Sequence, residues 1–323
     1  MPPIKRRTFL AQSAAAVAAA AGLSSCISIK NTETTLTTPP PAPTGDLPPN
    51  PIACSTYSFW RYRDDSQYSV EACIEHSANM GFDGVDILHE QMAGESNPYL
   101  QTLKRKALIN GIDLCCLSIQ QDFVDPDRDV RQKNIDHTIH CIELAYSLGI
   151  PIVRLNTGRW NTVMPFTRLM ENNGLEPPLP GYTEDDGFPW VIDAIEKCLP
   201  AAEKCGVLLG LENHWGLART AAGLLRIVND IDSPWLPILL DTGNFLEEPF
   251  ESMEKCADKT VFIQAKTYFG GGTWYTLDLD YPRIGKMMRS HGFKGYVSLE
   301  FEGNDDPLTA IPKSLKILRS AFS

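Results

Sequence analysis

Basic residues are scarce in most of this chain of 323 residues. The whole chain has 29 lysines and arginines and 40 aspartates and glutamates. Its first 50 residues contain four of the basic and two of the acidic residues. The rest therefore carries 25 basic and 38 acidic side chains, a net charge of −13. Such a surface repels phosphate backbones, and no stretch of the sequence forms a basic groove that would overcome the repulsion. We expect no nucleic-acid partner.

The N-terminal apolar segment is too short to cross a membrane, which needs about 20 apolar residues. It runs from Ala11 to Ser25, follows the twin arginine Arg6-Arg7, and ends in "LSSC" at Cys26. This order resembles a twin-arginine export signal with a lipoprotein cleavage site, with an amphipathic or frayed N-terminal helix as the alternative. We expect residues 1–26 to direct export to the periplasm, with a lipid anchor on Cys26. The Thr- and Pro-rich residues 27–50 are expected to form a linker.

The sequence contains no CxxC pair, so a cysteine zinc site is not expected. Eight of the nine cysteines, from Cys54 to Cys256, stand mostly among apolar residues. A free cysteine in such surroundings behaves as a small hydrophobic residue. Twin-arginine cargo is exported already folded, as the resemblance of the signal implies. We therefore expect free thiols in place of disulfides.

From residue 52 onward, eight short apolar runs alternate with stretches of helical period. Apolar runs flanked by helices are typical of parallel strands that are covered on the outside. Eight such units in about 270 residues predict a closed (β/α)₈ TIM barrel over residues 51–323. A doubly wound open sheet is the alternative, but the first run leads into "STYSFWRYRDD", which lacks the glycine-rich turn of that fold. The runs are 52–59, 83–88, 112–119, 150–156, 206–212, 236–241, 260–266 and 295–301.

Polar residues stand where the last four runs end, at the side of a barrel where active sites form. We assign Glu212, Asp241, Gln264 and Glu300 to the ends of the fifth, sixth, seventh and eighth predicted strands. Any one of them alone is more simply a helix cap or a solvated acid. Together they supply four oxygen ligands, which suit a divalent cation such as Mg²⁺ or Mn²⁺.

The order of these motifs resembles the xylose isomerase-like barrels, the sugar phosphate isomerase and epimerase superfamily. The resemblance rests on a Glu after the fifth run, "LDTGN" after the sixth, a polar-x-Lys in the seventh and "VSLEFEG" in the eighth, and covers residues 51–323. It implies a divalent metal, Mn²⁺ or Mg²⁺ before Zn²⁺ or Co²⁺, held by Glu212, Asp241, Gln264 and Glu300. The chain departs from the family at "FIQAK", where Gln264 stands in place of histidine and offers only a neutral carbonyl oxygen.

The resemblance also implies the chemistry. A cation on the carbonyl and adjacent hydroxyl of a sugar stabilises an enediolate, and two carboxylates exchange the carbon-bound proton. By the same resemblance Glu212 and Glu300 are these acid–base residues. His214 and Asn244 are expected to reach substrate hydroxyls, with a structural role at the cap of the next helix as the alternative for His214. Lys266 is expected to hold an oxyanion or hydroxyl, with a salt bridge at the barrel rim as the alternative. Other expected substrate contacts follow earlier strands or offer an aromatic face: His89, Asn156, Trp60 and Trp215. Each of these is equally explained by packing.

The resemblance leaves several functions open. We expect an isomerase or epimerase of a sugar or keto-sugar. A lyase or dehydratase acting on a keto-sugar, and a sugar-binding barrel without catalysis, are the alternatives. The abasic-site endonucleases of the same superfamily need a histidine-rich zinc site, which six histidines and a charge of −13 argue against. Residues 157–187 interrupt the alternation and are expected to form a lid, with contact to a second copy of the chain, or disorder, as the alternatives.

Overall fold

The structure is a computed structural model that describes residues 47–63 and 67–323. The predicted export signal, with Arg6, Arg7 and Cys26, lies outside these residues. The last four residues of the predicted linker are described, and they pack against the barrel. Arg289 donates hydrogen bonds to the carbonyl oxygens of Leu47 and Pro48, and Asn50 donates one to the carbonyl of Gly295. The ordered domain therefore begins before residue 51.

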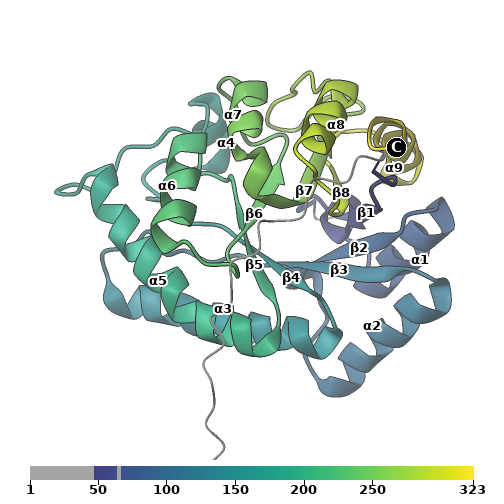
Figure 1. Cartoon of the computed structure of the whole chain (residues 1–323), viewed down its shortest axis with the longest axis horizontal. Helices are drawn as coiled ribbons and strands as arrows, with labels where there is room; N and C mark the ends of the chain where they lie inside the picture. The colour runs from purple at the N-terminus through teal and green to yellow at the C-terminus, as the bar shows by residue number, and fades with distance from the viewer. Residues whose placement is uncertain (1–46, 64–66) are drawn as a thin grey trace, which may run out of the picture. The chain divides into compact units, whose positions relative to one another are not determined.

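A closed barrel of parallel strands lies at the centre of the described residues, as predicted (Figure 1). Each strand pairs with its successor, and β8 returns to β1 with Ile52 opposite Val297. The strand bounds are β1 Ile52–Ser55, β2 Gly84–Leu88, β3 Asp113–Ser118, β4 Ile152–Leu155, β5 Leu208–Glu212, β6 Ile238–Asp241, β7 Thr260–Thr267 and β8 Val297–Phe301.

Helices surround the strands and cover their outer faces (Figure 1). Their ends follow local chemistry: the Ser69 hydroxyl accepts a hydrogen bond from the Ala72 amide at the start of α1, and Gly81 ends that helix at φ 91°. The α-helix bounds are α1 Val70–Met80, α2 Asn97–Asn110, α3 Arg128–Leu148, α4 Phe166–Glu171, α5 Glu184–Cys205, α6 Ala221–Ile231, α7 Pro249–Cys256, α8 Tyr281–Ser290 and α9 Pro307–Ala321.

Short 3₁₀ helices follow two strands at the barrel mouth. The first predicted strand stops at Ser55, and Thr56–Phe59 form the 3₁₀ helix η1. After β2 the chain turns through η2, His89–Gln91, and a third 3₁₀ helix, η3, covers Ala257–Lys259. These tight turns change the direction in which side chains beyond the strands point. His89, the first residue of η2, is one of the side chains affected.

The cysteines from Cys54 to Cys256 are all free, and all but Cys205 are buried, as expected. No helix within 47–63 or 67–323 combines the length and the apolarity that crossing a membrane requires. The insertion 157–187 contributes α4, which the sequence did not predict, and the first turn of α5.

Candidate active site

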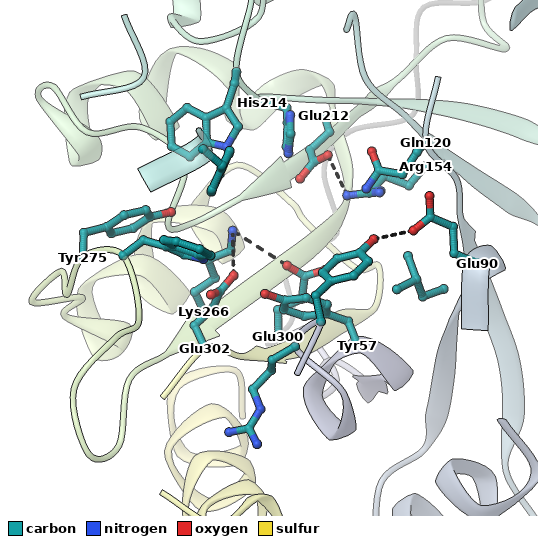
Figure 2. A pocket seen from close by; sticks show the side chains of 16 residues that line it. Tyr57, Glu90, Gln120, Arg154, Glu212, His214, Lys266, Tyr275, Glu300 and Glu302 are labelled. Atoms are coloured by element: carbon teal, nitrogen blue, oxygen red, sulfur yellow. Dashed lines mark hydrogen bonds and ion pairs between the residues drawn. The ribbon is translucent and has the colours of Figure 1, made fainter. Parts of the chain in front are cut away.

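A cavity of about 490 Å³ opens at the carboxyl ends of the strands (Figure 2). That volume suits a small-molecule substrate. Its walls combine carboxylates, cations and aromatic rings, contributed by the strand ends and by the loops beyond them. The lining residues are Tyr57, Arg61, Tyr62, Leu88, Glu90, Gln120, Arg154, Phe166, Glu212, His214, Trp215, Lys266, Trp274, Tyr275, Glu300 and Glu302.

The ends of β5 and β6 are tied together by Asn213. Its side chain accepts a hydrogen bond from the Asp241 amide at 2.7 Å and donates one to the Asp241 carbonyl at 2.8 Å. The Asp241 Oδ1 atom accepts from the Gly243 amide at 2.7 Å, which fixes the carboxylate. Gly243 is required here because a Cβ atom would lie 2.5 Å from Cδ of Lys266. The "LEN" and "LDTG" segments thus hold two carboxylates rigidly at the mouth.

Lys266 lies among three of the acids and one amide. Its Nζ atom is 3.1 Å from Asp241 Oδ2, 3.5 Å from Glu302 and 3.8 Å from Glu300. It also donates a hydrogen bond of 2.8 Å to Asn244 Oδ1. Burial opposes ionisation of the ammonium, but the carboxylates, Asp241 first, keep the Lys266 pKa well above its usual value. Lys266 is therefore a fixed positive charge at the mouth.

Glu212 is paired with a second cation. Arg154 of β4 donates from Nη1 to Glu212 Oε2 at 3.0 Å, and both side chains are buried. Asn244 donates to the other Glu212 oxygen at 3.1 Å. Burial raises the pKa of Glu212 to about 7, against the lowering effect of Arg154. A carboxyl with a pKa near neutrality can both accept and release a proton, as acid–base catalysis requires.

Glu300 and His214 are two further ionisable residues that line the cavity and are relevant to proton transfer (Figure 2). Burial raises the pKa of Glu300 well above its usual value, and Lys266 opposes that shift. Burial, followed by repulsion from Arg154 and Lys266, lowers the pKa of His214 well below its usual value. His214 is thus a neutral imidazole that can hydrogen-bond a hydroxyl group but carries no charge.

Gln264 does not line the cavity but belongs to a polar layer inside the barrel. Its Nε2 atom donates to Asp86 Oδ2 at 2.9 Å and to Ser118 Oγ at 3.2 Å, while Ser298 also donates to Asp86. Its Oε1 atom is buried and has no hydrogen-bond partner within 47–63 or 67–323. Gln264 stands opposite Asp241 in the register of β6 and β7. Among the described residues, Asp241 Oδ2 is paired only with Lys266, whose Nζ atom lies 3.1 Å away.

Aromatic rings form one wall of the cavity. Phe166 of α4 packs edge-on against Trp274 and Trp215, with ring centroids 5.1 and 6.5 Å apart. Trp215 in turn packs edge-on against Tyr275 at 6.2 Å. Such a wall suits the apolar face of a sugar ring. Phe166 shows that the insertion 157–187 supplies part of the cavity, as a lid would.

Three residues expected from the sequence to contact substrate lie outside the cavity lining. His89 turns away toward Glu95, to which its Nε2 atom is bound at 2.7 Å. Asn156 donates to the Gln120 side chain and closes the turn at Gly158. Trp60 packs its ring against Tyr62, with centroids 4.5 Å apart. Of the other predicted residues, Glu212, His214, Trp215, Lys266 and Glu300 line the cavity, and Asp241 and Asn244 contact Lys266.

Several lining residues were not predicted. Tyr57, Arg61 and Tyr62 follow β1, whereas Trp274 and Tyr275 lie in the loop after β7. Loops carry no periodicity that would assign their side chains to a cavity. Glu302 could have been predicted from the sequence, because it follows Glu300 by two residues and side chains two residues apart in a strand point to the same face.

The fold and the family of this chain are shown by comparison with known proteins. Residues 74–321 match the model of the xylose isomerase-like TIM barrel family. The chain belongs to this family. The match covers more than half of the 323 residues and every strand from β2 to β8, including the four that carry the predicted ligands.

Individual relatives process sugars or sugar acids. The chain is 28% identical, over 67% of its length and 68% of the relative's, to 3-oxo-isoapionate decarboxylase of Pectobacterium atrosepticum. Its fold is similar to that of the E. coli 3-keto-D-glucoside 4-epimerase YcjR, with a TM-score of 0.67 and 18% identity over 84% of this chain and 99% of the other. D-psicose 3-epimerase of Clostridium cellulolyticum H10 gives a TM-score of 0.60 and 17% identity over 84% and 95%.

The residues at the mouth fit a divalent cation. Among the described residues, four carboxylates, those of Glu212, Asp241, Glu300 and Glu302, contact only two cations, Arg154 and Lys266. Burial, followed by repulsion from Asp241, raises the pKa values of Glu212 and Glu300 although Arg154 and Lys266 oppose the shift. Two more oxygens lie on neighbouring strands: Asp241 Oδ2, which is paired with Lys266, and Gln264 Oε1 in the polar layer, which forms no hydrogen bond among the described residues. Both are hard donors.

Proposed function

We propose that this barrel catalyses proton transfer on a sugar or keto-sugar, as an isomerase or epimerase acting through an enediolate. One observation carries the proposal: Glu212 and Glu300, two buried acids with raised pKa values, line one cavity from strands separated by β6 and β7. Acids placed at different sides of a substrate can remove a proton from one carbon and return one elsewhere.

The remaining side chains of the site bind and orient. Lys266 offers a fixed positive charge to a developing oxyanion, and neutral His214 offers a hydrogen bond to a hydroxyl. Arg154 and Asn244 hold the two oxygens of Glu212 in place. Glu212, Asp241, Gln264 and Glu300 would hold a divalent cation, which when bound would act as a Lewis acid on the carbonyl and adjacent hydroxyl. The aromatic wall excludes water from one side of the ring.

Deuterium exchange tests the proposal. The purified chain is incubated with Mn²⁺ in heavy water with aldoses, ketoses and 3-keto-glycosides, and the recovered sugars are examined by NMR. We expect deuterium at the carbon next to the carbonyl, together with the isomer or epimer. Tight sugar binding that survives chelation, without exchange, would favour a binding protein that has lost catalysis.

A decarboxylase is the second candidate, because the relative from P. atrosepticum acts on a 3-oxo acid and three cations line the cavity, Arg61, Arg154 and Lys266. The carboxylate group of such a substrate needs positive charges to bind it. In this reaction the bond to the carboxyl carbon breaks, its electron pair forms an enolate, carbon dioxide leaves, and a carboxyl group protonates the carbon. Adding 3-oxo sugar acids to the panel and measuring released carbon dioxide separates the two: exchange without gas supports the isomerase.

Metal binding should be linked to proton release. Cation binding favours ionised carboxylates. In the metal-free chain, by contrast, burial raises the pKa of Glu212 to about 7. Below that pH the cation must displace protons, so the affinity for Mn²⁺ should fall by up to about tenfold per pH unit for each proton displaced. Calorimetry in two buffers of different ionisation enthalpy counts these protons. An affinity independent of pH around neutrality would place the metal away from Glu212 and Glu300.

The substitution Gln264→His should change the metal preference. If the Gln264 carbonyl is a ligand, all donors are oxygens and favour Mg²⁺ or Mn²⁺, whereas imidazole nitrogen favours Zn²⁺ or Co²⁺. We expect the order of affinities measured by calorimetry to shift toward Zn²⁺ and Co²⁺. Gln121→His is a matched control, since Gln121 is also buried but donates to the Asn156 carbonyl. The same order in wild type and Gln264→His would remove Gln264 from the ligand set.

A further inference from the structure

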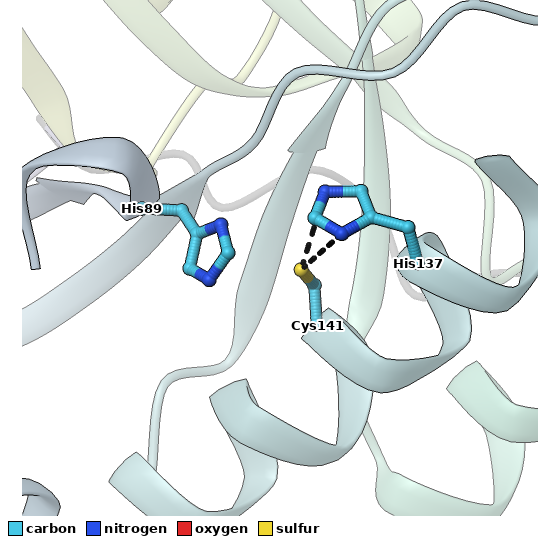
Figure 3. Close-up of side chains that lie close together, drawn as sticks. All are labelled: His89, His137 and Cys141. Carbon is cyan, nitrogen blue, oxygen red and sulfur yellow. Dashed lines mark hydrogen bonds between the residues drawn. The ribbon is translucent and has the colours of Figure 1, made fainter. Parts of the chain in front are cut away.

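Two histidines and a cysteine meet outside the cavity, between η2 and α3 (Figure 3). One ligand atom from each of His89, His137 and Cys141 lies within 4.8 Å of the other two. We call these three residues the His/Cys cluster. His137 and Cys141 are one turn apart on α3 and therefore share a face of the helix. His89 approaches that face because η2 turns it away from the substrate cavity.

The ligand atoms lie close to the spacing of a metal site. The Sγ atom of Cys141 is 3.7 Å from Nε2 and 3.9 Å from Nδ1 of His137. Zinc bonds of about 2.0 Å to nitrogen and about 2.3 Å to sulfur, in a tetrahedron, place such donors about 3.5 Å apart. The rings of His89 and His137 have centroids 5.5 Å apart. Closing the cluster on an ion thus needs ring rotations and movements of about 1 Å.

A carboxylate already orients one of the histidines. Glu95 contacts Nε2 of His89 at 2.7 Å and, with its other oxygen, Nε2 of His140 at 2.6 Å. This leaves Nδ1 of His89 as the nitrogen that can coordinate. A carboxylate on the distal nitrogen is the usual support of a metal-bound histidine, because it fixes the ring and makes it a stronger donor. Packing alone does not require this arrangement.

We propose that the His/Cys cluster is a second metal site, specific for Zn²⁺ or a similar borderline cation and separate from the oxygen ligands of the barrel mouth. Two imidazoles and a thiolate select Zn²⁺ or Co²⁺ over Mg²⁺ and Mn²⁺. Cys141 is buried and His89 is 15% exposed, so the fourth position is open to a water molecule from the side of His89.

Occupancy of this site stabilises one wall of the substrate cavity. His89 lies in the chain between Leu88 and Glu90, both of which line the cavity. His137 interacts with the backbone of Gln120, another lining residue. A metal that joins η2 to α3 holds these three lining residues in place. The site is therefore a positioning element for the wall formed after β2 and β3.

Cobalt spectroscopy tests the proposal. The purified full chain is stripped with a chelator, kept reduced with a phosphine, and titrated with Co²⁺. We expect one equivalent to give a near-ultraviolet charge-transfer band from thiolate to cobalt, with the intense visible bands of tetrahedral Co²⁺, and Zn²⁺ to abolish both. No described residue that lines the cavity at the barrel mouth carries sulfur. Those residues cannot produce the thiolate band, so the two sites are distinguished.

Three variants decide the outcome. Cys141→Ser should remove the thiolate band, whereas Cys256→Ser, another buried cysteine, should keep it. Glu95→Gln should weaken Co²⁺ binding by about 10- to 100-fold while retaining the band, and its side chain is exposed enough for folding to be unaffected. Absence of the band in the reduced full chain, or its persistence in Cys141→Ser, would overturn the proposal.

Discussion

Glu212→Gln should lower the rate of deuterium exchange by about 10²- to 10⁴-fold, whichever metal is present. The amide preserves the size of the side chain and can still hydrogen-bond Arg154 or Asn244. It cannot accept the substrate proton, because it has neither the charge nor the pKa of about 7 of the carboxyl group. Exchange measured by NMR under saturating sugar isolates this loss from any change in substrate binding.

Glu90→Gln is the matched control. Glu90 lines the same cavity but accepts a hydrogen bond from the Tyr62 hydroxyl and lies beyond β2, remote in the chain from the acids of β5 to β8. Its substitution should change exchange far less than that of Glu212. Retention of wild-type exchange in Glu212→Gln would remove this residue from catalysis and leave Glu300 as the sole acid–base candidate.

The residues at the strand ends were predictable because two independent features of the sequence and the fold determine their positions. Apolar runs show where each strand stops, and parallel strands closing a barrel bring their carboxyl ends to one mouth. Glu212, Asp241 and Glu300 end or nearly end their strands and therefore converge without any knowledge of the loops. Lys266 and Gln264 were placed in the same strand, but the sequence did not show that only Lys266 reaches the cavity.

Side chains beyond the strand ends were not predictable in the same way. His89 directly follows β2, yet the 3₁₀ turn η2 directs it to α3 and Glu95. Trp274 and Tyr275 reach the cavity from a loop without a period. The His/Cys cluster combines a loop residue with two residues of a helix about 50 positions later, a proximity that depends on how α3 packs.

Arg154→Met should shift the pH dependence of exchange to higher pH. Arg154 stabilises the ionised form of Glu212 across a buried contact of 3.0 Å, and an opposite charge at that distance lowers a carboxyl pKa by about 1–3 units. Methionine fills a similar volume without the charge, so the Glu212 pKa should rise above its value of about 7. At neutral pH the ionised fraction, and with it the exchange rate, should fall by about 10- to 10³-fold. Raising the pH should recover much of the loss.

The same substitution should alter stability in a defined pH window. Burial raises the pKa of Glu212 in the folded chain above that in the unfolded chain. The free energy of unfolding therefore falls as the pH rises from the unfolded pKa to the folded pKa, where the carboxyl of the folded chain ionises. In the wild type this loss ends near pH 7, whereas in Arg154→Met it continues to the higher pKa. The difference in unfolding free energy, measured by urea denaturation, should therefore grow as the pH rises above about 7, by about 1–4 kcal/mol for the expected rise of about 1–3 pKa units.

Two further variants separate the charge of Arg154 from general damage to the fold. Arg154→Lys retains a cation and should return the pH profile part of the way toward the wild type. Arg159→Met removes the arginine of another pair, Arg159 with Glu176 at 2.7 Å, outside the cavity lining. It should lower stability without moving the pH profile. A profile unchanged in Arg154→Met would mean that the ionisation of Glu212 does not control proton transfer, because no other cation contacts the Glu212 carboxylate among the described residues.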